Sequence, residues 1–455
     1  MDNRPRRGLD TTGKFDGGGP AKGPALPEGR GPPDRPDRAL ERSQGVRAMD
    51  KPDVIIVGGG LAGPILAIAL ASGGVRSTVV DAEPAATHAA PDFDGRAYAI
   101  SLSSRRMLEV LGPWRRVGAE AEPIAEIRIS DGRPGEGAGP LDLHFHGQEI
   151  DEGPMGHIVE DRVLRRAVLD SLAASDRITH RTGVRVVGQE AGPGRIRLTL
   201  DDGSHLEAPL VVGCDGRTSG TARRAGIGRL GRDYRQTSLV CAIAHARPHG
   251  GVAHQFFLPS GPLAILPLPG NRSSIVWTET RARAEIIHAL PPEAYLEELR
   301  PRFGAFLGDI GLAGRRYAYP LGLTLATRFT APRVALAGDA AHGVHPLAGQ
   351  GLNLGLRDVA ALAEVLVAAR RRGEDLGAAT VLDGYARWRR VDTAMLVAAT
   401  DTINRVFSND NPLLRLGRDL GLGLVNRLPP VRRELIRAAA GISGDLPRLL
   451  RGNPV

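Results

Sequence analysis

The feature that most constrains the fold is a short β-α-β pattern that begins near residue 53. Residues 53–57 form a continuous apolar run, which is typical of a buried parallel strand. Residues 61–71 are rich in alanine and leucine and predict a helix. Residues 77–81 predict a second strand that ends at Asp81, an acid expected to bind an adenosine ribose. Because the turn before the helix reads Gly58-Gly59-Gly60-Leu61-Ala62-Gly63, a G-x-G-x-x-G, the chain is predicted to be an α/β protein with a Rossmann-like dinucleotide-binding unit.

The residues of this motif suit a bound pyrophosphate. Gly58 allows the tight turn, Gly60 lets the backbone approach the pyrophosphate, and Gly63 lets the helix pack closely on the sheet. Leu61 and Ala62 open the helix, whose free N–H groups and positive dipole end attract phosphate. The motif by itself does not distinguish NAD from FAD.

The composition excludes several classes of protein. Of the 455 residues, 42% are hydrophobic and 24% are charged, which is ordinary for a globular protein of two or more domains. The two cysteines, Cys214 and Cys241, exclude a disulfide scaffold and a cysteine-rich zinc site. No apolar run reaches the roughly 20 residues of a membrane span. The net charge of +8 comes from dispersed arginines and only 4% of residues are aromatic, so we expect no nucleic-acid partner.

Two later strands also end in short patterns that bear on the identity of the cofactor. Residues 210–217 predict an apolar strand that ends in Asp215-Gly216, and residues 334–342 predict another that ends in Gly338-Asp339. The order G-x-G-x-x-G, Asp-Gly, Gly-Asp resembles the flavoprotein aromatic hydroxylases, the single-component FAD monooxygenases. The resemblance implies that FAD is the cofactor and that Asp339 binds its ribityl chain. It also implies that Asp215-Gly216 lies near the pyrophosphate and is linked to the use of NAD(P)H.

The segment from His345 to Asp358 narrows the resemblance. Its sequence, HPLAGQGLNLGLRD, is similar along its full length to the signature of the ubiquinone-biosynthesis hydroxylase branch. Residues 94–101 and 261–268 look similar to that branch too, whereas Asp161 stands where the family often has an amide or an arginine that touches FAD. The resemblance implies a para-hydroxybenzoate-hydroxylase-like fold: a Rossmann-like FAD-binding domain, a mixed-sheet substrate domain and a C-terminal helical segment.

The resemblance also implies which residues bind the cofactor. The helix that begins near Gly349 would offer backbone N–H groups and its positive end to the N1–O2 edge of the reduced flavin. Arg96 would neutralise the cofactor phosphates or contact the flavin, and a surface salt bridge is the alternative role for this residue. The expected cofactor-binding residues are Gly58, Gly60, Leu61, Ala62, Gly63, Asp81, Arg96, Asp215, Gly216, Gly338, Asp339, Gly349, Gln350, Gly351, Leu352 and Asn353.

Two residues ahead of that helix are expected to act in catalysis. By analogy with the family, Pro346 would place its carbonyl close to the substrate ring. His345 would move a proton, with a hydrogen-bonded structural histidine as the alternative. His342 and His345 lie three residues apart but have no third ligand at metal spacing, so we expect no metal site.

The reaction implied by the resemblance is the chemistry of the cofactor. NAD(P)H reduces FAD, O2 adds to the flavin to give a hydroperoxide, and an electron-rich phenol ring attacks the terminal oxygen. The expected substrate is a polyprenyl phenol of ubiquinone biosynthesis. Two alternatives stay open: an FAD monooxygenase that acts on another aromatic or an alkene, and a non-catalytic FAD-fold protein that binds prenyl groups.

The chain is expected to divide between the two domains several times. The expected order is a disordered Gly/Pro/Arg-rich tail (1–50), a first part of the FAD-binding domain (51–130), a mixed stretch (131–234) that returns to that domain at 156–230, a substrate-binding sheet domain (235–330), a last part of the FAD-binding domain (331–400) and a helical region (401–455). Apolar residues of the sheet domain, among them Phe256 and Trp277, fit a prenyl pocket and an ordinary core equally well.

The C-terminal region is leucine-rich and basic, with Leu413, Leu414, Leu416, Leu420, Leu422 and Leu424 among Arg415, Arg418 and Arg427. Such a helix can lie on an anionic membrane or pack against the main body, and the sequence leaves both interpretations open. A prenylated substrate, which resides in the bilayer, favours the membrane interpretation. We therefore expect a cytoplasmic protein with peripheral contact to the inner membrane, and partners among the other proteins of the ubiquinone pathway.

Overall fold

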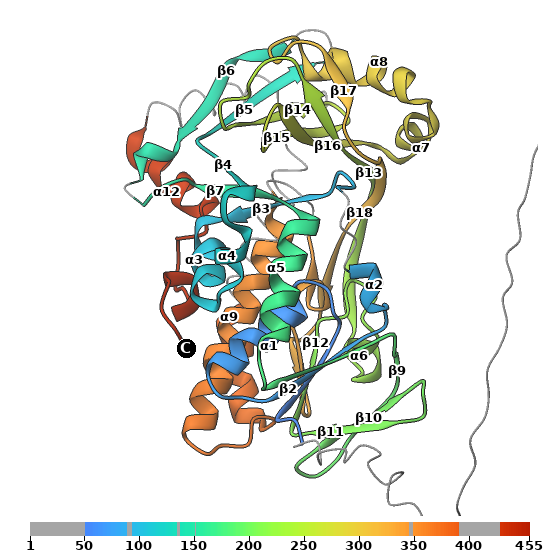
Figure 1. Ribbon diagram of the computed structural model, residues 1–455, viewed down its shortest axis with the longest axis vertical. Coiled ribbons are helices and arrows are strands. Elements are labelled where there is room, and N and C mark those ends of the chain that lie inside the picture. Colours follow the sequence, from blue (N-terminus) through green and yellow to red (C-terminus); the bar gives the residue numbers. More distant parts are fainter. Residues whose placement is uncertain (1–50, 89–92, 134–136, 151, 345–348, 391–427) are drawn as a thin grey trace, which may run out of the picture. The chain divides into compact units, whose positions relative to one another are not determined.

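The computed structural model describes residues 51–88, 93–133, 137–150, 152–344, 349–390 and 428–455 (Figure 1). The segment expected to be a disordered tail, residues 1–50, lies outside this part, as do residues 345–348 and 391–427. Residues 51–455 form one unit by their contacts. All contacts given below lie within that unit.

The first sheet carries the predicted nucleotide-binding unit. Its six strands are arranged in the order β19-β20-β12-β1-β2-β8, and all neighbours are parallel except β19 and β20. Four of these strands are fully buried, as expected for strands covered on both faces. The strands are β1 (Val54–Val57), β2 (Ser77–Asp81), β8 (Ile178–Thr182), β12 (Leu210–Gly213), β19 (Thr330–Ala331) and β20 (Val334–Leu336).

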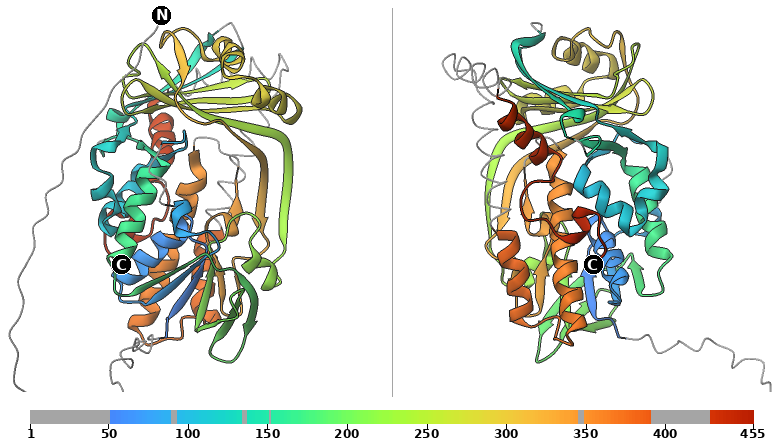
Figure 2. Two further views of the ribbon diagram at one scale, coloured as in Figure 1. Left: turned by 45° about the vertical axis from the view of Figure 1, so that its right-hand side comes forward. Right: turned by 90° about the vertical axis from the view of Figure 1, so that its left-hand side faces the viewer.

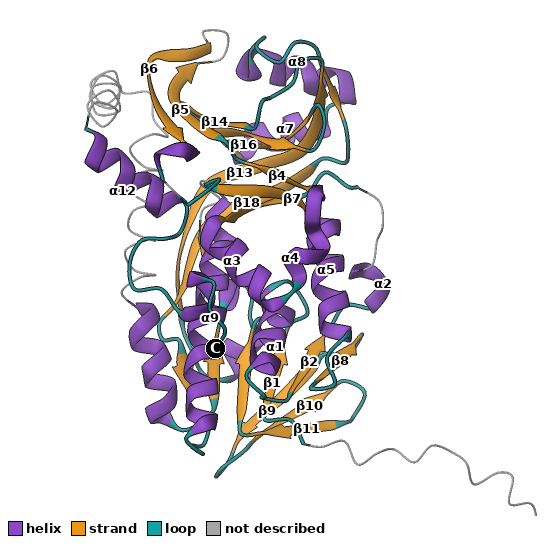
Figure 3. Cartoon of the chain, turned by 60° about the vertical axis from the view of Figure 1, so that its left-hand side comes forward, coloured by secondary structure: helices purple, strands orange, loops and turns teal. Residues whose placement is uncertain are grey.

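Three helices lie beside this sheet (Figure 3). They are α1 (Ala62–Ser72), α5 (Asp161–Ala173) and α9 (Gln350–Arg371), and α1 contacts both of the others. An antiparallel meander of β9 (Val186–Ala191), β10 (Ile196–Leu200) and β11 (His205–Ala208) contacts β1 through β11. The helix predicted to begin near Gly349 begins at Gln350, and the strand predicted at 77–81 has the same bounds in the structure.

The second sheet has nine strands and forms the predicted substrate domain. Its main path is β21-β18-β13-β16-β15-β14-β5-β6, and β17 also pairs with β13. The long strand β13 pairs with β18 over much of its length (Figure 2). The strands are β5 (Glu126–Arg133), β6 (Gly137–His146), β13 (Arg229–His245), β14 (Val252–Leu258), β15 (Gly261–Leu268), β16 (Arg272–Thr280), β17 (Ile310–Leu312), β18 (Tyr317–Ala326) and β21 (His342–Gly343).

The two faces of this second sheet pack differently. One face and the helices α7 (Arg281–Ala289) and α8 (Pro292–Phe303) enclose their own core, which includes Phe256 and Trp277. The other face, with Leu143 and Phe145, belongs to the core that also holds the first sheet. Phe256 and Trp277 thus serve packing beneath α7 and α8, so a prenyl pocket would have to use the opposite face.

A smaller sheet and the end of the chain complete the fold. Strands β3 (Ala97–Ser101), β7 (Gly156–Glu160) and β4 (Ala121–Pro123) pair in the order β3-β7-β4. Two further helices, α3 (Leu102–Leu111) and α4 (Pro113–Val117), follow β3, and α2 (Ala85–His88) follows β2. The short helix α6 (Gly220–Arg224) follows β12.

The C-terminal part of the described chain contains α12 (Pro429–Ala439) and the turn η5 (Arg448–Arg451), which contacts α3 and α9. The predicted fold class, an FAD-binding unit with a mixed substrate sheet and a helical C-terminal segment, is confirmed. The substrate sheet also takes in β5 and β6, which lie ahead of the 235–330 stretch of the expected domain order.

Candidate functional site

A cavity of about 620 Å³ lies at the carboxyl ends of β1, β2 and β12. This size is within the usual range for cofactor sites, and the edge where parallel strands end is where α/β sheets bind nucleotides. Its wall contains the predicted residues Gly58, Gly60, Asp81, Arg96, Asp215 and Gly216.

The glycine turn shapes one wall of the cavity. Gly58 has a φ of +116°, and a Cβ atom there would collide with the carbonyl of Cys214. A Cβ at Gly63 would collide with the carbonyl of Gly58, so α1 can approach the turn only at a glycine. In contrast, no described atom lies within 4 Å of the Cβ position at Gly60, which leaves a cradle for a ligand. No side chain caps the start of α1, at Leu61, so its first N–H groups face the site.

Asp81 lies at the end of β2 with only 5% of its surface exposed. Its Oδ1 accepts a hydrogen bond from the backbone N–H of Glu83 at 3.1 Å. A Cβ at Gly59 would collide with the Asp81 carboxylate, so the turn and the acid are packed directly together. This geometry holds the carboxylate at the cavity wall, where a ribose hydroxyl can donate to it.

The cavity wall carries an excess of positive charge. Five arginines line it, against the three carboxylates of Asp81, Glu83 and Asp215. The arginines are Arg96, Arg165, Arg185, Arg223 and Arg224. Because this excess lies beside an uncapped helix start, the wall suits a ligand with a pyrophosphate.

Arg96 lines the cavity and also forms ion pairs within the protein. Its Nε donates to Asp94 Oδ2 at 2.8 Å and its Nη2 lies 3.4 Å from Asp161 Oδ2, while the side chain also lines the cavity. The hydrogen bond to Asp94 raises the pKa of the Arg96 guanidinium. Asp161, buried at the start of α5, also accepts from Arg165 Nη2 at 2.9 Å. The acid at this unusual family position therefore holds two arginines at the cavity wall and does not itself line the cavity.

Asp215 organises the wall through the next helix. Its carboxylate accepts hydrogen bonds from the Ser219 hydroxyl at 2.5 Å, and from the backbone N–H and the hydroxyl of Thr221, both at 2.9 Å. These bonds fix the start of α6, which carries Arg223 and Arg224 to the cavity.

The Gly338-Asp339 turn lies beyond the lining of this cavity, at the end of β20. Gly338 has a φ of +65°, and its Cα lies 3.2 Å from the Cβ position at Gly355, so the turn packs against α9. The Asp339 carboxylate is partly exposed and accepts from Arg217 Nε at 3.2 Å. It is therefore accessible to the hydroxyl groups of a ribityl chain.

The start of α9 is tied to β3. Asn353 accepts from the backbone N–H of Ser101 at 3.0 Å and donates to the carbonyls of Ala99 at 2.8 Å and Gly349 at 3.2 Å. The Asn353 amide thus positions the helix start. No described atom lies within 4 Å of the Cβ position at Gly351, which keeps its backbone accessible, and Leu352 is half-buried next to it. The predicted catalytic residues His345 and Pro346, and the side chain of Gln350, lie outside the described residues.

A buried charged triad stands behind the Gly338-Asp339 turn. Asp358 accepts from His342 Nε2 at 2.5 Å and from Arg389 Nε at 2.6 Å, and its Oδ2 also accepts from the backbone N–H of Gly338 at 2.9 Å. All three side chains are almost fully buried. His342 is therefore a hydrogen-bonded structural histidine.

Comparison with known proteins decides the family. A family model described as an FAD binding domain matches residues 51–400. The ubiquinone hydroxylase UbiL of Rhodospirillum rubrum is 46% identical over 406 residues, which cover 89% of this chain and 93% of that protein. The chain belongs to the FAD-binding ubiquinone hydroxylases. The 3-demethoxyubiquinol 3-hydroxylase of Escherichia coli is 34% identical, over 86% of this chain and 98% of that protein.

A solved structure shares the fold of this ubiquinone hydroxylase. The p-nitrophenol 4-monooxygenase PnpA from Pseudomonas putida DLL-E4 matches with a TM-score of 0.72 at 20% identity, over 87% of this chain and 98% of that chain. FAD is the cofactor, and the open cradle at Gly60, the uncapped helix start and the arginines fit its pyrophosphate.

Sequence reasoning missed several residues of the hydroxylase site. Arg165 lies four residues after Asp161 on α5, and this i,i+4 spacing is a signal that the sequence contains. The partnership of Arg217 with Asp339 joins residues 122 positions apart, and no local pattern signals it. Arg389 is separated from Asp358 by 31 positions, so the buried triad is also invisible in the sequence.

Proposed function

We propose that this ubiquinone hydroxylase uses NAD(P)H and O2 to hydroxylate the aromatic ring of a polyprenyl phenol in ubiquinone biosynthesis. The observation that carries the proposal is the arginine-lined cavity at the glycine turn in a chain 46% identical to a ubiquinone hydroxylase. FAD, when bound, supplies the redox chemistry between NAD(P)H, O2 and the ring.

The residues of the chain bind and orient in this reaction. The N–H groups at the start of α1, with Arg96 and Arg165, hold the pyrophosphate, and Asp81 holds the adenosine ribose. Asp339, which follows β20, holds the ribityl chain. The substrate ring would lie on the face of the second sheet that turns away from α7 and α8, where buried apolar side chains exclude water.

The polyprenyl tail motivates a second part of the proposal, which is peripheral binding to an anionic bilayer through α12. Val431 and Leu435 are exposed on α12, and the exposed Leu428 directly precedes the helix. Arg433 is exposed on the same helix. No helix among the described residues combines the length and apolar character needed to cross a membrane. Binding would therefore occur from one side, with apolar residues inserted at the level of the headgroups.

The experiment that tests the reaction starts with deletion of the gene in its host. Quinones are extracted and the accumulating compound is identified by mass spectrometry. Loss of ubiquinone with build-up of a prenylated phenol that lacks one oxygen is expected, and the intact gene should restore ubiquinone. Purified FAD-loaded protein should then oxidise NAD(P)H in the presence of that phenol and O2 and form the hydroxylated product. Normal ubiquinone in the deletion strain, or NAD(P)H oxidation that yields no hydroxylated phenol, would contradict the proposal.

A further inference from the structure

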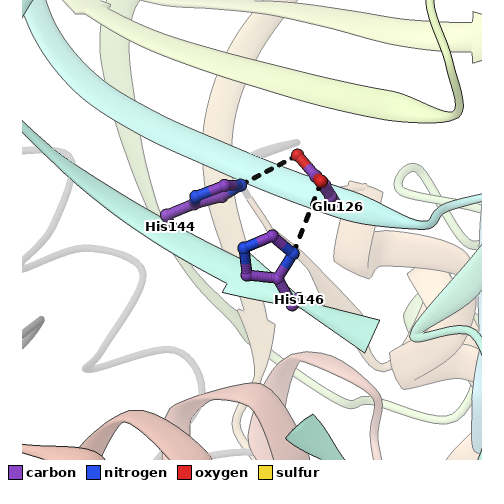
Figure 4. Close-up of side chains that lie close together, drawn as sticks. All are labelled: Glu126, His144 and His146. Atoms are coloured by element: carbon purple, nitrogen blue, oxygen red, sulfur yellow. Dashed lines mark hydrogen bonds and ion pairs between the residues drawn. The ribbon is translucent and has the colours of Figure 1, made fainter. Parts of the chain in front are cut away.

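Three potential metal ligands converge on the substrate sheet, outside the FAD site. Glu126 lies on β5, and His144 and His146 lie on β6, which pairs antiparallel with β5. His144 Nε2 is 2.8 Å from Glu126 Oε2, and His146 Nδ1 is 3.4 Å from Glu126 Oε1 (Figure 4). One ligand atom from each of the three residues lies within 4.8 Å of the other two. This separation is close to what a single metal ion requires, because Zn²⁺ binds nitrogen and oxygen at about 2.0–2.2 Å.

The strand register explains why the three side chains meet. Glu126 is directly opposite His146, and Arg128 is directly opposite His144. Residues two apart on a strand point to the same face, so both histidines and Glu126 share one face of the sheet. Figure 4 shows the two imidazoles on one side of the carboxylate.

The cluster can be reached from solvent and lies away from the cofactor. The side chains are 25% exposed for Glu126, 26% for His144 and 46% for His146. The residues between them on the strands, such as Ile127 and Phe145, point to the other face and join the core shared with the FAD-binding unit. The cluster therefore occupies the outer face of the substrate sheet.

We infer that Glu126, His144 and His146 form a binding site for one Zn²⁺ ion. Two imidazoles and one carboxylate form a ligand set that Zn²⁺ accepts, and three protein ligands leave a position for water. Bound Zn²⁺ would fasten β6 to β5. Among the described strands β6 ends the sheet on this side and pairs only with β5, so a metal at its end would hold an edge strand.

The placement of the side chains supports this assignment. The Glu126 carboxylate lies 2.8 Å from His144 Nε2 and 3.4 Å from His146 Nδ1. The two imidazole rings are 4.0 Å apart and tilted by 46°. One metal ion could therefore bind both imidazoles as neutral ligands beside the carboxylate.

Arg128 provides an internal test. Its Nη2 lies 3.2 Å from Glu126 Oε2, so its positive charge competes with a cation for the same oxygen. Removing that charge should strengthen metal binding, whereas an adventitious surface histidine site has no reason to respond in this way.

The experiment uses the full-length, FAD-loaded protein without a histidine tag. Zn²⁺ is titrated by calorimetry, and Co²⁺ serves as a spectroscopic probe of the ligand set. We expect one Zn²⁺ per chain, and a loss of affinity of at least about tenfold in each of Glu126→Gln, His144→Asn and His146→Asn. Arg128→Gln should raise the affinity. His205→Asn, on β11, removes an exposed histidine elsewhere and should bind as the unchanged protein does.

Thermal unfolding supplies a second readout that does not depend on activity. Added Zn²⁺ should raise the melting temperature of the unchanged protein and of His205→Asn, but not that of His144→Asn. The flavin absorbance of each variant verifies that it is folded. Sub-stoichiometric binding, or equal Zn²⁺ affinity in the unchanged protein and in His144→Asn, would overturn the inference. Neither result depends on which phenol is hydroxylated.

Discussion

Asp358 connects the Gly338-Asp339 turn, α9 and the segment that carries Arg389 through one fully buried carboxylate. Burial raises the pKa of Asp358, but the charges of His342 and Arg389 lower it more, so the carboxyl stays ionised below its usual pKa. The folded pKa is therefore lower than the unfolded one. The corresponding stability is present above about pH 4 and is lost as the pH falls through the folded pKa.

Replacing Asp358 with Asn should leave the buried Arg389 guanidinium without its charged partner. We expect the free energy of unfolding at pH 7 to fall by about 3–5 kcal/mol, measured by urea denaturation. FAD retention should fall as well, because Asp358 also anchors the backbone of Gly338. Asp375→Asn is the matched control, since it breaks the more exposed ion pair with Arg333 and should cost about 1 kcal/mol or less. Equal losses of unfolding free energy in the two variants would show that burial of the Asp358–Arg389 pair adds nothing to stability.

The positions of some site residues could be predicted from the sequence, and those of others could not. Gly58, Gly60 and Asp81 were predictable because their spacing within one β-α-β unit fixes their positions. Asp161 departs from the family pattern, and only the structure shows that it holds Arg96 and Arg165 at the cavity wall.

Two glycines of the turn between β1 and α1 serve different purposes: one allows close packing and the other leaves space for a ligand. Gly63 meets the carbonyl of Gly58, whereas Gly60 has no described neighbour within 4 Å of its Cβ position. Gly63→Ala should therefore lower the stability of the FAD-free protein, by about 1–3 kcal/mol of overpacking. Gly60→Ala should leave that stability nearly unchanged but weaken FAD binding by roughly tenfold or more, because the methyl group would fill the cradle.

The pair serves as its own control. Urea denaturation of the FAD-free variants gives the stability, and fluorescence titration with FAD gives the affinity. Tight FAD binding in Gly60→Ala would show that the pyrophosphate does not lie over this turn.

Elements with a local signal were predicted well, and pairings between distant elements were not. Strand β2 and helices α1 and α9 were predicted from the composition and pattern of their own segments. The pairing of β5 with β14, in which Glu126 lies opposite Val252, joins segments far apart in the chain and has no local signal. β5 and β6 are consecutive strands, but their register is irregular between Ser130 and Gly132, so the meeting of Glu126 with His144 and His146 could not be read from spacing alone.

At the scale of the whole molecule, the substrate sheet separates two environments. Its inner face joins the core of the FAD-binding unit, and its outer face carries α7, α8 and the Glu126 cluster. At the end of the chain, α12 is anchored by the buried Ile436 and by Arg432 and Arg437, which pair with Glu149 at 2.8 Å and Glu152 at 3.0 Å. α12 therefore packs on the body through one side and leaves Val431 and Leu435 exposed, whereas the leucine-rich stretch singled out in the sequence lies within residues 391–427, outside the described part of the chain.

The exposed face of α12 leads to a prediction about the membrane. Changing Leu428, Val431 and Leu435 together to Asp removes three apolar side chains, each worth about 1.5–3 kcal/mol when fully buried, and adds negative charge. Co-sedimentation with vesicles of phosphatidylcholine and phosphatidylglycerol should fall at least tenfold. Val187→Asp, on β9, changes an even more exposed aliphatic residue elsewhere and should sediment as the unchanged protein does. Since FAD absorbance and NAD(P)H oxidation with a short-chain phenol should persist in both variants, equal co-sedimentation of the two would place the lipid contact outside α12.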